Sequence, residues 1–132
     1  MKYLLDTHIW IWSVSNPKKL SEEVKEILKN KSHELFISSI SFWEFMVLLE
    51  KGRITISKPV DKWIKRAVNK SNIKEIPIDK KIAIQSRKME LPHQDPADRF
   101  IAATAFLYQL SLITSDGKLA KNQDITIIFN KV

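Results

Sequence analysis

The strongest constraint on the fold of this chain is the alternation of short apolar runs with longer segments of helical periodicity. Five runs are typical of buried β-strands: Lys2–Thr7, Glu34–Ser39, Ile73–Ile78, Leu110–Ser115 and Ile125–Phe129. Between them, helices are predicted over Leu20–Lys31, Ser41–Lys51, Pro59–Lys70, Asp79–Met89 and Pro96–Gln109. Strands that alternate with helices predict an α/β fold with a mostly parallel sheet covered on both faces.

A length of 132 residues fits one domain, and we expect it to span residues 1–132 because no linker or repeat interrupts the pattern. No apolar run approaches the roughly 18 residues that cross a bilayer. The N-terminus does not have the pattern of a secretory signal, and cysteine is absent. We therefore expect a cytoplasmic protein with no membrane partner.

Four carboxylates fall at predicted strand ends or helix starts. Asp6 ends the first strand, and Glu44 lies in the first turn of the helix after the second strand. Asp98 lies in the first turn of the helix opened by Pro96, and Asp116 directly follows the penultimate strand. In a doubly wound sheet the ligand crevice lies beyond the carboxyl ends of the strands, so these acids are expected to converge there.

Clustered carboxylates repel one another and need a counter-charge. A site built from oxygen ligands alone suits Mg²⁺ or Mn²⁺, which polarises a phosphoryl oxygen and lowers the pKa of bound water. The chain as a whole is basic, with 22 Lys and Arg against 15 Asp and Glu and a net charge of +7. A basic surface around an acidic pocket indicates a polyanionic substrate and hydrolysis of a phosphodiester bond.

Each acid also has a structural interpretation. Asp6 can cap the turn after the first strand, and Glu44 can form a capping box with Ser41. Asp95 can cap the helix in which Asp98 favours the dipole, and Asp116-Gly117 is a common turn pair. Four such coincidences at several strand ends are harder to accept than one, but the residues alone leave both interpretations open.

Four motifs carry a family resemblance: LLDTH at Leu4–His8, SSISFWE ending at Glu44, DPADRFIAATA from Asp95, and LITSD ending at Asp116. Together they resemble PIN-domain ribonucleases and, more narrowly, the VapC toxins of prokaryotic toxin–antitoxin pairs. The resemblance covers nearly the whole chain, and DPADR followed by an Ala-rich helix is its most specific part.

The resemblance implies a single PIN-like domain with parallel strand order 3-2-1-4-5. It also implies that Asp6 and Asp98 are the principal metal ligands. Glu44 and Asp116 would bind a second ion or orient the attacking water. The expected supporting residues are Thr114 and Ser115, which offer hydroxyls to the acids, Asp95 behind the ligands, and Arg99, which would pair with a carboxylate or an RNA phosphate.

The resemblance further implies an RNA substrate such as tRNA or ribosomal RNA, a homodimer, and an antitoxin that covers the cleft. We therefore predict a Mg²⁺- or Mn²⁺-dependent endoribonuclease. Three alternatives stay open: a nucleic-acid-binding module without catalysis, an aspartyl-phosphate phosphatase, and a DNA nuclease of similar build. The phosphatase usually needs a second Asp two residues after the first, where this chain has His8.

Other residues near the motifs are assigned to packing or solvent. Zinc ligation by His8 or His93 is not expected, because a zinc site would need more nitrogen ligands. We expect the tryptophans near the acids to pack in the core or at a dimer interface, and the lysines and arginine at helical spacing to form an RNA-facing stripe or a solvated face. These residues are Trp10, Trp12 and Trp43, and Lys62, Lys65, Arg66 and Lys70.

Overall fold

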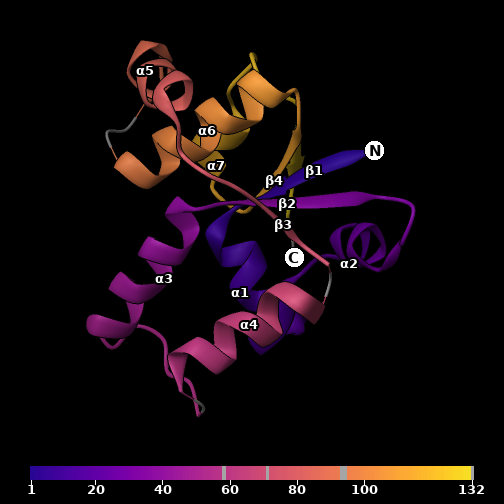
Figure 1. Cartoon of the computed structure of the whole chain (residues 1–132). Helices are drawn as coiled ribbons and strands as arrows, with labels where there is room; N and C mark the ends of the chain where they lie inside the picture. The colour runs from indigo at the N-terminus through magenta and orange to yellow at the C-terminus, as the bar shows by residue number, and fades with distance from the viewer. Residues whose placement is uncertain (58, 71, 93–94, 132) are drawn as a thin grey trace.

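A computed structural model describes residues 1–57, 59–70, 72–92 and 95–131. Its sheet has five strands, all parallel, in the order β3-β2-β1-β4-β5 (Figure 1). The strands are β1 Lys2–Leu5, β2 Glu34–Ser38, β3 Lys74–Ile76, β4 Ser111–Thr114 and β5 Ile127–Phe129. The α/β class and the predicted order 3-2-1-4-5 are both confirmed.

Helices cover both faces of the sheet. They are α1 Thr7–Ser15, α2 Glu22–Lys29, α3 Ile40–Glu50, α4 Val60–Lys70, α5 Lys80–Lys88, α6 Pro96–Tyr108 and α7 Gly117–Ala120, with a 3-10 turn η1 at Pro17–Lys19. Helices α1 to α4 lie on one side of the strands and α5 and α6 on the other (Figure 1). None of the helices within the described ranges is long and apolar enough to span a membrane.

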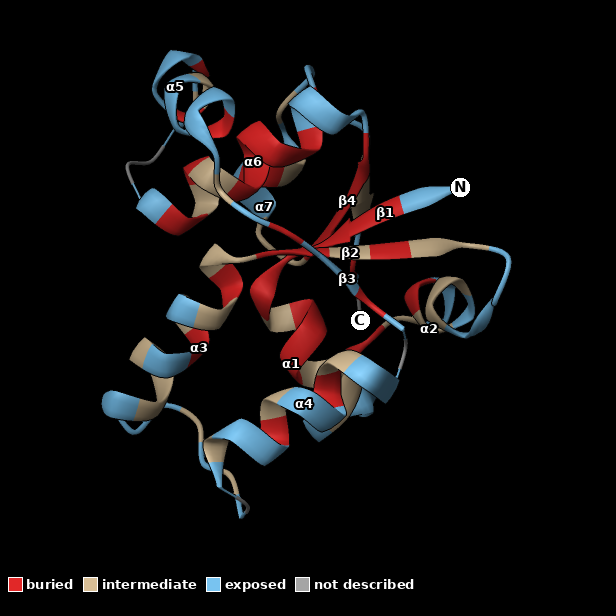
Figure 2. Cartoon of the chain, viewed as in Figure 1, coloured by how far each residue is buried: buried red, intermediate tan, exposed pale blue. Residues whose placement is uncertain are grey.

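The two faces of the sheet produce two hydrophobic cores because side chains alternate along each strand. Tyr3 and Leu5 of β1 belong to the core beneath α1, α2, α3 and α4. Leu4, between them, belongs to the core beneath α5, α6 and α7. Figure 2 shows that the buried residues concentrate along the central strands and on the inward sides of the helices.

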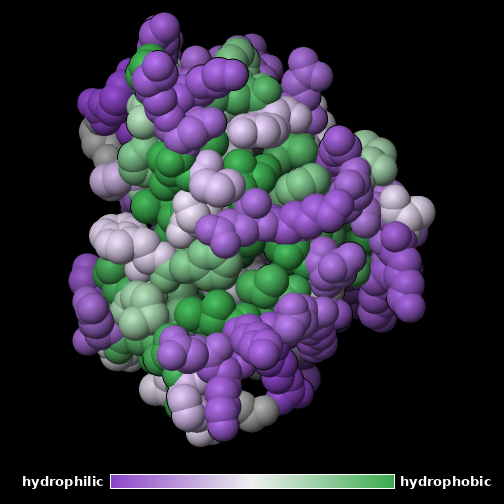
Figure 3. Space-filling view, in the orientation of Figure 1, coloured by the Kyte–Doolittle hydropathy of each residue, from purple (hydrophilic) through white to green (hydrophobic). Residues whose placement is uncertain are grey.

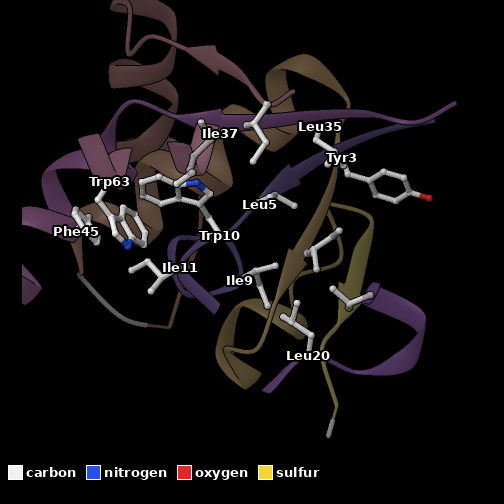
Figure 4. Packing of buried hydrophobic residues seen from close by; sticks show 14 residues of the cluster. Tyr3, Leu5, Ile9, Trp10, Ile11, Leu20, Leu35, Ile37, Phe45 and Trp63 are labelled. Carbon is white, nitrogen blue, oxygen red and sulfur yellow. The ribbon is translucent and has the colours of Figure 1, made fainter. Parts of the chain in front are cut away.

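An aromatic cluster ties α1, α3 and α4 together. The Trp10 side chain is fully buried, and its ring centroid lies 5.7 Å from that of Phe45 and 5.6 Å from that of Trp63. The rings of Phe45 and Trp63 stack with centroids 4.5 Å apart (Figure 4). Trp10 is therefore a core residue, as predicted, and its packing fixes the helix that follows Asp6.

Two helices, α1 and α7, are not predicted from the sequence. The α1 sequence, THIWIWSVS, has no single apolar face, because three consecutive residues, Ile9, Trp10 and Ile11, are all buried. A helix packed on several sides does not show the 3.6-residue period from which helices are predicted. Helix α7 spans only four residues, Gly117–Ala120, in the place where a turn was expected.

Candidate active site

The carboxyl ends of β1 and β4 bring Asp6 next to the segment that holds Asp116. The two strands pair directly, with Leu5 opposite Ile113, and the Asp6 backbone N–H donates to the Ile113 carbonyl at 2.9 Å. The charge of Asp116 acts on Asp6, whose pKa it raises. The prediction that these two acids meet at the centre of the sheet edge is therefore consistent with the geometry.

Asp6 is buried, with 6% of its surface exposed, and both of its carboxylate oxygens accept hydrogen bonds. Oδ1 accepts from the backbone N–H of Thr7 at 2.8 Å, and Oδ2 accepts from the Thr114 hydroxyl at 2.6 Å. The first of these bonds makes Asp6 the N-cap of α1. Asp6 thus caps a helix, and at the same time it places a buried carboxylate at the end of a central strand.

Glu44 lies half-buried in α3, and its Oε1 is a buried oxygen with no hydrogen-bond partner among the described residues. The capping box predicted with Ser41 is wrong, because α3 begins at Ile40 with Ser39 at the N-cap position. Ser41 instead lies in the first turn of α3, with its hydroxyl oxygen 2.8 Å from that of Thr7. Glu44 is therefore available for a role other than capping.

Burial raises the pKa values of both Asp6 and Glu44. For Asp6 the hydrogen bonds from Thr114 and Thr7 oppose this rise. For Glu44 a hydrogen bond from the Thr7 side chain opposes it, while the charges of Asp6 and Asp95 add to it. Asp6, Glu44 and Asp95 are therefore close enough to interact electrostatically, although they come from β1, α3 and α6.

The start of α6 contributes two of the predicted acids. Asp95 is exposed and caps the helix, because its Oδ1 accepts from the backbone N–H groups of Ala97 at 2.9 Å and Asp98 at 3.4 Å. Asp98 lies half-buried in the first turn, and α6 packs against α3, the helix of Glu44. The predicted capping role of Asp95 is confirmed, and its charge also reaches the site.

Arg99 points into the protein. Its guanidinium is buried and donates to the carbonyl oxygens of Ser86 at 2.8 Å and Met89 at 2.6 Å, at the end of α5. These two bonds join α5 to α6, and a side chain 5% exposed presents little surface to an RNA phosphate. These two bonds indicate a structural role for Arg99, and the expected pairing with a carboxylate or an RNA phosphate stays a prediction.

The end of β4 supplies the expected hydroxyl. The Oγ1 atom of Thr114 accepts from the backbone N–H of Asp116 at 3.0 Å while the same hydroxyl donates to Asp6. Ser115, between Thr114 and Asp116 in the chain, is half-buried. Asp116 caps α7, because its Oδ1 accepts from the Lys118 backbone N–H at 2.8 Å. Thr114 thus connects the two acids through hydrogen bonds, as its position predicts.

The chemistry of the acids fits a hard cation, since the donors are all oxygens and Oε1 of Glu44 is buried without a partner. Among the residues that the structure describes, however, no three or more Asp, Glu or His side chains are grouped closely enough to hold a metal ion. Asp6 and Glu44 are buried oxygen donors, and their binding of a cation stays a prediction. Convergence of all four acids on one ion stays a prediction.

The remaining residues near the motifs differ in exposure. The half-buried ring of His8 lies 5.6 Å from that of Trp12, which also contacts Lys19. His93 lies outside the described residues. Trp43, in contrast, is 54% exposed, so the core packing expected for it is wrong within this chain and a dimer contact is untested.

The four basic residues at helical spacing, Lys62, Lys65, Arg66 and Lys70, are all exposed on α4. Figure 3 shows hydrophilic side chains over the outer faces of α4 and α5, with apolar side chains gathered between the two helices. The stripe is therefore accessible to solvent, and an RNA contact on it stays a prediction.

Sequence reasoning did not single out Thr7, and it named Ser41 only as a capping partner of Glu44. Both side chains are completely buried, and their hydroxyl oxygens lie 2.8 Å apart. Their positions, directly after Asp6 and three residues before Glu44, were the available signal.

The comparisons of this chain with known proteins agree on one family. The family model for the PIN domain matches residues 3–125. Ribonuclease VapC22 of Mycobacterium tuberculosis is 30% identical over 123 residues, which cover 91% of each chain.

Solved structures show the same fold. VapBC2 from Rickettsia felis, bound to a DNA fragment of its promoter, superposes with a TM-score of 0.69 at 18% identity and covers 99% of this chain and 100% of its own. DNA-bound VapBC from Salmonella typhimurium has a TM-score of 0.68 at 23% identity, with 98% of each chain covered.

Proposed function

We propose that this chain, which belongs to the PIN-domain family and to its VapC-type ribonucleases, is a metal-dependent endoribonuclease and the toxin of a toxin–antitoxin pair. The observation that carries the proposal is the pair of acids at the sheet edge. Asp6 is a buried carboxylate, and Glu44 holds a buried oxygen without a hydrogen-bond partner among the described residues. Such a pair is costly unless a cation or a proton compensates the charge.

The residues that would hold the cation are Asp6 and Asp98, with Glu44 and Asp116 as further ligands or as groups that orient water. When bound, Mg²⁺ or Mn²⁺ supplies charge stabilisation at a phosphoryl oxygen and lowers the pKa of water. The chain itself holds Asp6 in place through Thr114 and Thr7, whose bonds fix both carboxylate oxygens. Asp95 caps α6 and so positions the turn in which Asp98 lies.

We further propose that the substrate is RNA and that this basic chain holds the RNA backbone through exposed Lys and Arg side chains. A cognate antitoxin is supported by the likeness in fold to the VapBC structures. We also propose that the chain forms a homodimer and acts in the cytoplasm.

The test is cleavage of RNA by the purified protein in Mg²⁺ or Mn²⁺. Asp6→Asn and Asp98→Asn are expected to abolish cleavage while the melting transition persists. Asp61→Asn is the matched control, because this aspartate is exposed in the first turn of α4, away from the sheet edge. Undiminished cleavage by both site variants would refute the mechanism, and a matched DNA oligonucleotide separates an RNA nuclease from a DNA nuclease.

A second candidate is a nucleic-acid-binding module without catalysis. It is favoured by the capping bonds, since Asp6, Asp95 and Asp116 each cap a helix. Thermal melts in rising Mn²⁺ separate the two candidates, because an ion that binds the native state raises the melting temperature. RNA binding without a Mn²⁺-dependent shift, and without cleavage, would favour the binding module.

A further inference from the structure

A groove opens at the amino ends of β2 and β3, at the end of the sheet opposite the acids. It has a volume of about 550 Å³ and lies between the C-terminal ends of α2 and α4. Figure 1 shows these two helix ends near the start of β2, whereas α1 and α3 begin at the other ends of the strands. Because β2 is five residues long, the groove lies roughly 15 Å from the edge that holds Asp6.

Four exposed lysines give this groove, which we call the lysine groove, its charge. They are Lys29 at the end of α2, Lys31 in the turn that follows, Lys70 at the end of α4 and Lys74 in β3. The acid among its described lining residues is Glu34, and that carboxylate already pairs with Lys74 at 3.0 Å. The other three lysines form no ion pair with a described residue, so the groove carries excess positive charge.

The lysine groove continues along α2. A second hollow of about 370 Å³ shares Lys29, Asn30 and His33 with it and adds Glu26. The Oδ1 atom of Asn30 accepts from the backbone N–H of Ser32 at 2.9 Å and from its hydroxyl at 2.6 Å. The NH₂ group of Asn30 forms no hydrogen bond with a described residue, so it can donate to an anion.

The lining of the groove favours a nucleic-acid backbone over a protein segment. The large apolar side chains that are exposed in the described part of the chain, such as Trp43 and Phe106, all lie outside it. The leucines that line it are half-buried at Leu28 and buried at Leu35. Protein interfaces have apolar and aromatic residues at their centre, whereas phosphate oxygens are bound mainly by cationic and polar side chains.

Helix stability explains only part of this cluster of cations. Lys29 and Lys70 lie in the last turns of α2 and α4, where a cation interacts favourably with the helix dipole. That effect accounts for each of these two lysines alone. It does not account for Lys31 and Lys74, which lie outside both helices and line the same groove.

We propose that the lysine groove binds the sugar–phosphate backbone of the RNA substrate, at a point away from the bond that is cut. The inference rests on the proposed nuclease function, because it assigns a second contact surface to the same RNA. Only an RNA that extends roughly 15 Å past the acidic edge contacts both places. The groove therefore indicates a structured RNA as the substrate class, since an oligonucleotide of a few residues reaches one of the two places only.

The experiment is fluorescence anisotropy of a labelled hairpin RNA of about 30 nucleotides titrated with the full-length chain, with no divalent cation present, so that the RNA stays intact. Lys29→Gln/Lys70→Gln removes two charges from the groove. The slope of log affinity against log salt concentration should become shallower by about one for each lysine. Lys29→Arg/Lys70→Arg keeps both charges and should keep the wild-type slope.

Lys51→Gln/Arg53→Gln is the matched control. Both side chains are exposed cations at the end of α3, and neither lines the groove. This variant loses the same net charge and should change the slope much less. Thermal melts of all variants report the effect on the fold. If Lys29→Gln/Lys70→Gln is unstable, Lys31→Gln takes its place, with an expected loss of about one in the slope.

The outcomes distinguish this inference from the proposed function. A wild-type slope in the groove variants, or an equal loss in the control, overturns the inference and leaves the nuclease intact. Groove variants that lose binding of poly-glutamate but keep RNA binding overturn it in favour of an acidic protein segment. A wild-type chain that binds the hairpin through the groove but cleaves no RNA in Mn²⁺ refutes the nuclease alone, and one that does not bind RNA refutes both.

Discussion

The Thr114 hydroxyl donates a 2.6 Å hydrogen bond to Oδ2 of Asp6, although 108 residues separate them in the chain. The bond joins the ends of β4 and β1 at the edge where the acids gather. Because the same hydroxyl accepts the backbone N–H of Asp116 at 3.0 Å, it also sets the path of the chain into α7. Thr114 therefore couples the conformation of one acid to the orientation of the other.

Removal of this hydroxyl is expected to cost both stability and activity. Thr114→Val leaves Oδ2 of a buried carboxylate without its donor, which costs about 1–3 kcal/mol in the free energy of unfolding. RNA cleavage should fall because Asp6 loses one of its two fixed contacts. Thr114→Ser keeps the hydroxyl and should stay close to wild type in both denaturant unfolding and cleavage. Equal losses of stability and cleavage in the two variants would contradict a role specific to the hydroxyl, because Thr114→Ser keeps it.

Asp6→Asn is expected to abolish cleavage and to stabilise the metal-free fold. Burial raises the pKa of Asp6, so its ionised form is a cost to the folded state at neutral pH. The amide fits, since its oxygen can accept from the Thr7 N–H while its NH₂ group faces the Thr114 hydroxyl, which can also accept. A gain of about 1 kcal/mol would raise the melting temperature by about 2–8 °C.

The same variant has a defined pH dependence. Because the folded pKa of Asp6 lies above its unfolded value, the folded state holds the proton more tightly, and stability falls as pH rises from about 4 through the folded pKa. The melting-temperature gain of Asp6→Asn should therefore be largest at neutral pH and should shrink as the pH falls through the raised pKa of Asp6, because wild-type Asp6 then takes up a proton. A gain that does not change with pH would contradict this origin.

Glu34 supplies a control in which the pH dependence of stability has the opposite sign to that of Asp6. Its pKa is lowered by a hydrogen bond from Lys74, 3.0 Å away, and by the charges of Lys74 and Lys2. Its contribution to stability is therefore present above its unfolded pKa and is lost as pH falls. Glu34→Gln should lower the melting temperature slightly at neutral pH, and that loss should disappear in acid and in high salt, because the pair is exposed.

The sequence predicts those parts of the fold in which one face of an element is buried and the other is exposed. Helix α2 keeps a polar face and a capping Ser21, so its start is recognisable. Helix α1 is different, because Ile9, Trp10 and Ile11 are buried on successive sides, and packing replaces periodicity as the cause of the helix. The strand order was available only through family resemblance, since apolar runs do not specify which strands are neighbours.

The candidate site is predictable where position in the chain determines position in the sheet. Asp6 and Asp116 end paired strands, so their proximity follows from topology. The interior direction of Arg99 does not follow, because it bonds backbone carbonyls of Ser86 and Met89, which the sequence does not distinguish from any others. The buried contact between the hydroxyls of Thr7 and Ser41 likewise depends on the packing of α1 against α3.

Replacement of Arg99 tests whether its role is structural. A lysine ammonium cannot reproduce the planar geometry with which the guanidinium bonds two carbonyls at the end of α5. Arg99→Lys is therefore expected to lower the free energy of unfolding by about 2–4 kcal/mol, the cost of weakened charge-assisted hydrogen bonds in the interior. The salt dependence of RNA binding should be unchanged, because a side chain this deeply buried releases no counterions from RNA.

Arg66→Lys is the matched control, since Arg66 is exposed on α4 and the substitution keeps its charge. It should leave denaturant unfolding at the wild-type midpoint. If Arg99 instead contacts an RNA phosphate, Arg99→Lys would weaken RNA binding without loss of stability, and Arg99→Met would reduce the slope of affinity against salt by about one phosphate contact. Unfolding curves and salt titrations on the same variants therefore decide between an arginine that joins α5 to α6 and one that binds the substrate.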